Sequence, residues 1–144
     1  YIIFKVTPYS KKIARSILKE PKIYFYDNGL VIGDDGAKFE NLVANSLFKN
    51  IINANDYLGQ SQRLHYLRTK EQKEVDFALA DNKENILEIL EAKFSDSTIS
   101  NNLRYFSETY KIKATQIVDN LKIEKTVDNI DVVRAQNYLE ELSF

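Results

Sequence analysis

Two β-type runs separated by a short polar turn constrain the fold of this chain more than any other feature. The first run, residues 74–80, places an apolar side chain at every second position from Val75 to Leu79, which is the period of a strand. The second run, residues 86–94, is apolar and rich in β-formers. Because residues 81–85 between them are polar and turn-prone, we expect a tight antiparallel hairpin.

The symmetry of this turn decides which residues of the two strands face each other. If the turn is symmetric about residues 83 and 84, Asp76 lies opposite Glu91. Glu74 then lies opposite Lys93. Directly opposed residues have Cβ atoms about 4.5–5.5 Å apart, and two carboxylates that close repel unless a positive charge lies between them. One face of the hairpin therefore carries all four side chains, provided that no bulge interrupts the register.

Carboxylates gathered in this way suit a hard divalent cation. Oxygen ligands from a few carboxylates, completed by water and phosphate, are the ligands that Mg²⁺ and Mn²⁺ take. Such a cation polarises a phosphoryl oxygen and lowers the pKa of an attacking water. Lys93 would position that water or stabilise charge in the transition state. The alternative interpretation is an exposed sheet face on which Lys93 forms salt bridges with Glu74 and Glu91.

A third carboxylate comes from an amphipathic helix expected at residues 36–48. Apolar residues recur there at helical spacing, and an aspartate at position 34 or 35 can supply the N-cap. Glu40 lies at the flank of the apolar stripe, from which it would reach over the sheet toward Asp76 and Glu91. The alternative is an edge glutamate whose stem covers apolar surface while its carboxylate stays in water.

The order helix-Glu, strand-Asp, strand-Glu-x-Lys resembles the PD-(D/E)xK, or restriction-endonuclease-like, nuclease superfamily. Several longer phrases are similar to one group within it, the C-terminal domain of unknown function that follows the ATPase module in a prokaryotic AAA+ family. Their order and spacing agree from about residue 21 onward, which is most of the chain. The phrases are residues 21–30, 36–43, 66–69, 74–77 and 90–93.

This resemblance implies a role for each of four residues. Glu40, Asp76, Glu91 and Lys93 would be the catalytic residues. Glu40, Asp76 and Glu91 would bind Mg²⁺ or Mn²⁺, and DNA would be cleaved at a phosphodiester. Superfamily members also include ones that have lost catalysis, so the alternative is an inactive DNA-binding or protein-interaction module of the same ATPase.

The resemblance also implies the architecture. Residues 23–144 would form an α/β restriction-endonuclease-like core, a mixed central sheet flanked by helices. Residues 1–22 would be the end of a winged-helix-type segment. The partner would be the ATPase module of the same protein, which would bind ATP, because this chain has no G-x-x-x-x-G-K-[ST] phosphate loop.

The chain after the hairpin continues the α/β pattern. Residues 98–110 predict a helix that crosses the sheet, and residues 114–118 a strand parallel to the preceding one. Two short strands at 122–126 and 130–133 and a closing helix at 135–142 complete the expected elements.

Charge is more informative locally than over the whole chain. The net charge of −1 argues against a wholly basic nucleic-acid binder. Basic residues nevertheless gather in residues 1–24 and 61–73, where the alternative is an ordinary solvated surface. The residues expected to contact phosphates are Lys11, Lys12, Arg15 and Arg68.

Composition excludes other kinds of site and segment. The absence of cysteine excludes disulfides and thiolate metal sites, and a single histidine argues against zinc. No run approaches the length of a transmembrane helix and no signal-peptide pattern is present, which predicts a cytoplasmic protein without membrane contact. His65 is expected to be structural, Gln116 is a candidate to line the site, and Asp27 is expected to form a turn.

Overall fold

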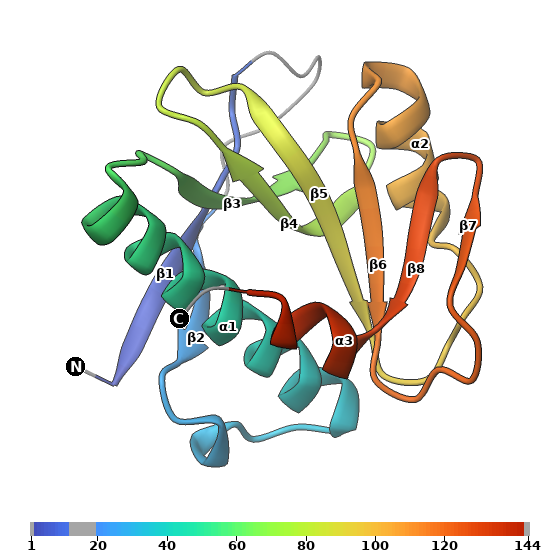
Figure 1. Cartoon of the computed structure of the whole chain (residues 1–144), viewed down its shortest axis with the longest axis horizontal. Helices are drawn as coiled ribbons and strands as arrows, with labels where there is room; N and C mark the ends of the chain where they lie inside the picture. Colours follow the sequence, from blue (N-terminus) through green and yellow to red (C-terminus); the bar gives the residue numbers. More distant parts are fainter. Residues whose placement is uncertain (1, 12–19, 143–144) are drawn as a thin grey trace.

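A computed structural model describes residues 2–11 and 20–142 as a mixed sheet flanked by helices (Figure 1). The α/β fold class expected from the sequence is confirmed. Within the described residues the sheet has eight strands in the order β2-β1-β3-β4-β5-β6-β8-β7. The strands are β1 (Ile3–Pro8), β2 (Lys22–Phe25), β3 (Arg63–Arg68), β4 (Glu74–Ala80), β5 (Ile86–Lys93), β6 (Ala114–Val118), β7 (Lys125–Val127) and β8 (Ile130–Arg134).

Helices cover both faces of this sheet and give it two cores. The helices are α1 (Asp35–Leu58), α2 (Asn101–Tyr110) and α3 (Ala135–Glu140), with a short 3₁₀ helix η1 (Asn28–Leu30). Figure 1 shows α1 and α3 on one face, where Phe39 and Leu47 of α1 pack against Phe77 of β4. On the other face, Leu103 and Phe106 of α2 pack with residues from the same strands.

Helix α1 is longer than the helix expected at residues 36–48. Its N-cap is Asp34, one of the two expected, whose carboxylate accepts from the backbone N–H of Ala37 at 2.8 Å. The helix continues to Leu58 because the apolar stripe continues through buried Ile51 and Ala54. It ends at Gly59, which adopts the left-handed conformation with φ 66°.

The β4–β5 hairpin has the expected register from Phe77 to Leu79, and the register shifts by one residue between Leu79 and Ala80, next to the turn. Phe77 pairs with Leu90 and Ala78 with Ile89, which is the symmetry that places Asp76 opposite Glu91. The turn closes with the Asp81 N–H donating to the carbonyl of Asn85 at 2.9 Å. The expected antiparallel hairpin is therefore confirmed.

Strict alternation along β4, in contrast, is wrong. Val75 belongs to the core beneath α2, whereas Phe77 belongs to the core beneath α1. The cause is a bulge in β4. His65 pairs with Ala78 and Leu67 pairs with Val75, so a step of two residues along β3 corresponds to a step of three along β4. The extra residue reverses the facing of the strand on either side of Asp76.

The elements after the hairpin agree with the expected pattern except at their ends. Strand β6 has the expected bounds and is parallel to β5. Helix α2 begins at Asn101 rather than 98, because Asp96 forms a turn by accepting from the Thr98 N–H and Ser100 supplies the N-cap. Strand β7 begins at Lys125 rather than 122, and α3 ends at Glu140 rather than 142.

The first strand belongs to the same sheet as the rest of the chain. Strand β1 is antiparallel to β2 and parallel to β3. The domain boundary expected after residue 22 falls inside β2, directly after its first residue, and β2 pairs with β1. Within the described residues, no helix combines the length and the apolar character needed to cross a lipid bilayer.

Candidate functional site

Asp76 and Glu91 lie where the pairing of β4 and β5 ends. The last paired residues are Phe77 and Leu90. Beyond them, the two strands are joined by hydrogen bonds from backbone N–H groups to the two carboxylates. The N–H of Asp76 donates to Glu91 Oε2 at 3.2 Å, and the N–H of Ala92 donates to Asp76 Oδ2 at 3.0 Å. Each carboxylate therefore has one oxygen bound to the opposite strand. The other oxygens, Asp76 Oδ1 and Glu91 Oε1, have no backbone donor among these bonds.

Glu40 reaches this region from the first half of α1. Its Oε1 accepts a hydrogen bond from the Tyr24 hydroxyl at 2.7 Å, and the same oxygen lies 3.5 Å from Lys22 Nζ. Glu40 is half-buried at the edge of the α1 stripe, as its place beside Phe39 and Val43 predicts. The helix thus brings a third carboxylate toward the pair on the hairpin.

Lys22 joins carboxylates from two elements. Its Nζ lies 2.8 Å from Glu74 Oε1, 3.5 Å from Glu40 Oε1 and 3.7 Å from Asp76 Oδ1. The ammonium also lies 5.2 Å from the centre of the Tyr66 ring, within the range of a cation–π contact. Lys22 on β2 therefore supplies a positive charge that is shared by carboxylates of α1 and β4.

Glu74 does not pair with Lys93, which corrects the expectation from the hairpin register. The β4 bulge pairs Glu74 with Arg68 of β3, and Glu74 Oε2 accepts from the Arg68 guanidinium at 3.0 Å. Its other oxygen binds Lys22. Lys93 instead lies 3.6 Å from Glu91 Oε1, with a side chain that is 37% exposed. Lys93 is therefore the member of the site that solvent reaches most easily.

The charges of the site perturb one another. Burial is the main cause that raises the pKa of Asp76, and the negative charges of Glu91 and Glu40 add to it. Burial also raises the pKa of Glu91, against the opposing effects of the Asp76 N–H and Lys93. For Lys22, burial lowers the pKa, but the surrounding carboxylates outweigh it and the net shift is upward. Lys22 thus remains charged, whereas burial favours the protonated forms of Asp76 and Glu91.

The donor set fits a hard divalent cation in its chemistry, because every acidic group here is a carboxylate. Lys22 already stands in for such a cation by binding three of them. In the described part of the chain, however, no three Asp, Glu, His or Cys side chains are gathered closely enough to hold a metal ion. The Lys22 ammonium pairs with Glu40, Glu74 and Asp76, whereas Glu91 pairs with Lys93.

Lys22 and Tyr24 were not identified from the sequence as members of the site. Both belong to β2, and residues two apart on a strand point to the same face. A charged and a hydroxyl side chain on the same face of an apolar run is the signal that could have identified them. The sequence pattern does not show which residues Lys22 and Tyr24 contact, because only the fold brings β2 beside Glu40 and Asp76.

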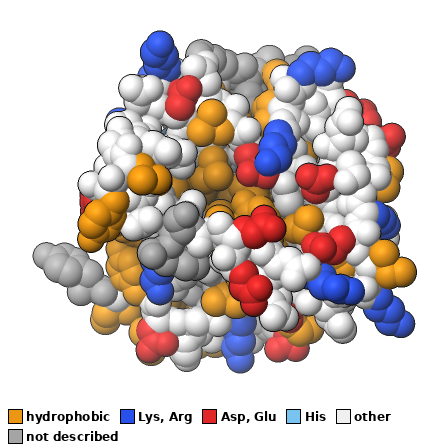
Figure 2. Space-filling view, viewed as in Figure 1, with side chains coloured by type: hydrophobic (Ala, Val, Ile, Leu, Met, Phe, Trp, Pro, Cys, Tyr) orange, Lys and Arg blue, Asp and Glu red, His pale blue; other side chains and the backbone are white. Residues whose placement is uncertain are grey.

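The other candidates lie apart from the carboxylates or outside the described residues. Lys11 is exposed after β1, and Arg68 contacts the site through its hydrogen bond to Glu74. The predictions for Lys12 and Arg15 lie outside the described residues. On the face seen in Figure 2, acidic and basic side chains are interspersed, unlike a basic nucleic-acid surface.

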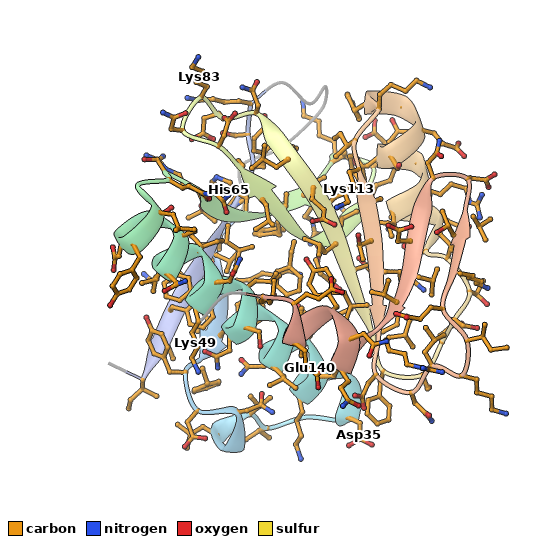
Figure 3. All side chains as sticks on the ribbon, in the orientation of Figure 1. Asp35, Lys49, His65, Lys83, Lys113 and Glu140 are labelled. Carbon is orange, nitrogen blue, oxygen red and sulfur yellow. The ribbon has the colours of Figure 1, made fainter. Side chains whose placement is uncertain are left out.

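His65, Gln116 and Asp27 have structural contacts. The His65 ring, labelled in Figure 3, bonds to Thr7 and lies 3.7 Å from Glu84 in the hairpin turn. Burial is the main cause that lowers the pKa of His65. Gln116 is fully buried and binds the loop before α2. Asp27 caps η1, which confirms its expected turn role.

Most of the chain matches a known protein family. The family described as "Domain of unknown function (DUF4143)" matches residues 35–138. This span contains Glu40, Asp76, Glu91 and Lys93, and it begins after Lys22 and Tyr24. Comparisons with curated proteins and with solved structures each gave no significant match.

Proposed function

We propose that this chain, which belongs to the DUF4143 family of domains of unknown function, is a metal-dependent nuclease-type domain that cleaves a phosphodiester of DNA. The observation that carries the proposal is the pair of carboxylates of half-buried Asp76 and buried Glu91, each of which accepts a hydrogen bond from the strand that carries the other. Burying like charges costs folding free energy. Ionisable groups perturbed in this way gather at functional sites.

Glu40, Asp76 and Glu91 would hold Mg²⁺ or Mn²⁺. Asp76 Oδ2 and Glu91 Oε2 are occupied by backbone N–H groups, so Asp76 Oδ1 and Glu91 Oε1 are the oxygens left for a ligand. The bound cation would polarise a phosphoryl oxygen and lower the pKa of an attacking water. The backbone bonds orient both carboxylates, in the way that outer contacts orient the ligands of a metal site.

Lys93 would act on the substrate. Its side chain is 37% exposed and its ammonium lies next to Glu91, so it can donate hydrogen bonds to a phosphate oxygen or to the attacking water. In the reaction the water oxygen forms a bond to phosphorus, one ester bond of the phosphodiester breaks, and the leaving oxygen takes up a proton. Lys93 would stabilise the negative charge that develops on the phosphoryl oxygens during this exchange.

A cleavage assay on the full-length protein tests the proposal. Supercoiled plasmid, single-stranded DNA and RNA are incubated with Mg²⁺, Mn²⁺ or EDTA, using wild type and the double variant Asp76→Asn, Glu91→Gln. We expect metal-dependent cleavage that the double variant loses. The matched control is Asp56→Asn, Glu108→Gln, which changes an exposed aspartate and an exposed glutamate outside the site. Equal cleavage by wild type and the site variant, or none by wild type with any metal, would refute the proposal.

The second candidate is a non-catalytic DNA-binding or protein-interaction module. The observation that favours it is Lys22, which neutralises carboxylates without any metal. DNA binding that persists in EDTA, without cleavage in Mg²⁺, would support this candidate. For both candidates, the resemblance of the sequence phrases supports an AAA+ ATPase module of the same protein as the partner.

A further inference from the structure

We propose that Asn28 is a site of self-modification, at which the side-chain amide is lost at a rate that the fold sets. The chain contains a single Asn-Gly pair, Asn28-Gly29. Asparagine is a chemically labile residue, and a following glycine has no Cβ that would hinder attack by its own backbone nitrogen. The inference goes beyond the proposed function and does not depend on it, because it requires neither a metal nor a nucleic acid.

The reaction needs only the chain itself and water. The backbone nitrogen of Gly29 forms a bond to Cγ of Asn28, and the bond from Cγ to the side-chain nitrogen breaks. Ammonia leaves with the proton of the Gly29 N–H, and a succinimide ring remains. Water then adds to one of the ring carbonyls and breaks its bond to nitrogen. Breakage at Cγ gives aspartate, and breakage at the main-chain carbonyl carbon gives isoaspartate, so no atom changes its oxidation state.

Two hydrogen bonds hold the reacting groups in the folded protein. The Gly29 N–H donates to Asp27 Oδ1 at 2.8 Å. Asn28 Oδ1 accepts from Nδ2 of Asn41, a residue of α1, at 3.0 Å. A hydrogen bond to the protonated nitrogen and a negative charge next to it both oppose release of its proton. The nitrogen that must attack is therefore held protonated, and the amide that it must attack is bound to α1.

The partners of these bonds are themselves fixed. Asn41 is only 3% exposed, and it binds both backbone groups of Phe25. It accepts from the Phe25 N–H at 2.8 Å and donates to the Phe25 carbonyl at 3.0 Å, so it cannot follow the Asn28 side chain. The backbone around Asn28 belongs to η1, where the Leu30 N–H donates to the Asp27 carbonyl at 3.1 Å. Closure of the succinimide ring therefore requires η1 to open locally.

The product changes the segment that leads into α1. Isoaspartate adds a carbon atom to the main chain at residue 28. The bond from the Val31 N–H to the Asn28 carbonyl, which is 3.3 Å long, then cannot keep its geometry. Aspartate keeps the backbone of η1 and an oxygen that can accept from Asn41. Isoaspartate is therefore the product that opens η1.

Ageing of the wild-type protein tests the inference without any substitution. The protein is incubated at mildly alkaline pH in buffer and in guanidinium chloride. Peptides with aspartate or isoaspartate at residue 28 are separated by chromatography and quantified by mass spectrometry. We expect the Asn28 amide to be lost at least about tenfold more slowly in the folded protein, because the reaction waits for local opening. The Gly29 N–H should be protected from hydrogen exchange by a similar factor. Equal rates of amide loss in the two solutions, or a Gly29 N–H without protection, would overturn the inference.

A matched pair of variants tests the hydrogen bond to Asp27. Asp27→Ala removes the acceptor of the Gly29 N–H. Asp34→Ala removes the equivalent N-cap of α1, where Asp34 accepts from the Ala37 N–H at 2.8 Å. We expect folded Asp27→Ala to lose the Asn28 amide on the order of tenfold faster than wild type, because η1 opens more readily. Asp34→Ala should lose it at the wild-type rate. Equal acceleration in both variants, or none in Asp27→Ala, would overturn the inference.

Discussion

Asp76 and Glu91 each accept from the strand that carries the other, so two side chains take the place of a rung of the sheet. Backbone N–H groups of the opposite strand therefore hold both carboxylates in place. This exchange also places the two carboxyl groups close together where β4 and β5 separate, with Glu91 buried and Asp76 half-buried. The consequences for stability, for the neighbouring side chains and for the chemistry can each be tested.

The first prediction concerns the pH dependence of stability in Asp76→Asn. The folded pKa of Asp76 is raised above its ordinary value of 3.8, chiefly by burial. The folded protein therefore holds a proton that the unfolded chain has released, and stability falls as pH rises from about 4 toward the raised pKa. In EDTA at neutral pH, we expect Asp76→Asn to be more stable than wild type by about 1–2 kcal/mol, since one pKa unit corresponds to about 1.4 kcal/mol.

Urea denaturation at several pH values from 4 to 8 measures this effect. The free energy of unfolding of Asp76→Asn should fall less with rising pH than that of wild type. We attribute the fall that remains in the variant to Glu91, whose pKa is also raised. Asp56→Asn on the exposed surface of α1 serves as the control and should follow wild type. If Asp76→Asn is less stable than wild type at neutral pH, burial of this charge is not the dominant effect.

The second prediction concerns the hydroxyl that holds Glu40. Tyr24 donates to Glu40 Oε1 at 2.7 Å, and the ring packs in the core beneath α1. Tyr24→Phe keeps the ring and removes the bond, so we expect a loss of about 1.5–3 kcal/mol in the free energy of unfolding, as for a hydrogen bond to a charged acceptor. The control Tyr57→Phe changes a tyrosine that is 82% exposed and should lie within about 0.5 kcal/mol of wild type. Equal effects of the two variants would mean that the bond to Glu40 contributes nothing.

The part of the site that depends on local pattern could be predicted from the sequence. The polar turn and the apolar runs gave the hairpin, its register and the facing of Asp76 and Glu91, because these depend on residues close in the chain. Glu40 followed from helical spacing in the same way.

The rest depends on contacts between distant segments. The bulge in β4 arises from pairing with β3, and it turns Glu74 away from Lys93 and toward Arg68. Lys22 is more than fifty residues from Glu74, and only the placement of β2 beside β1 brings them together. Periodicity within a segment contains no information about either relationship.

The third prediction concerns the loop between β5 and α2. Gln116 is fully buried; its Oε1 accepts from the Ser100 N–H at 2.9 Å, and its Nε2 donates to the Thr98 carbonyl at 2.9 Å. Gln116→Leu has a similar volume but leaves these backbone groups without partners. We expect a loss of about 1–3 kcal/mol in stability, with faster amide hydrogen exchange at Ser100. A control is Gln60→Leu, at an exposed position just after α1. Unchanged exchange at Ser100 would contradict this role.

The fourth prediction separates the chemistry of Lys93 from its salt bridge. Lys93 lies 3.6 Å from Glu91, and Lys113 lies at the same distance from Glu88 on the same strand. Both lysines are at least partly exposed, so each pair contributes little to stability, about 0–1 kcal/mol. Only Lys93 adjoins the proposed metal ligands.

We therefore expect Lys93→Met to lower metal-dependent cleavage by about 10²–10³-fold, as for loss of a group that stabilises transition-state charge. Lys113→Met is the matched control and should keep the cleavage rate of wild type. Metal affinity should not fall in Lys93→Met, because an ammonium next to Glu91 opposes a cation rather than binding it. Single-turnover cleavage and calorimetric metal binding measure the two effects separately. A parallel loss of cleavage and metal affinity would show instead that Lys93 acts by positioning Glu91.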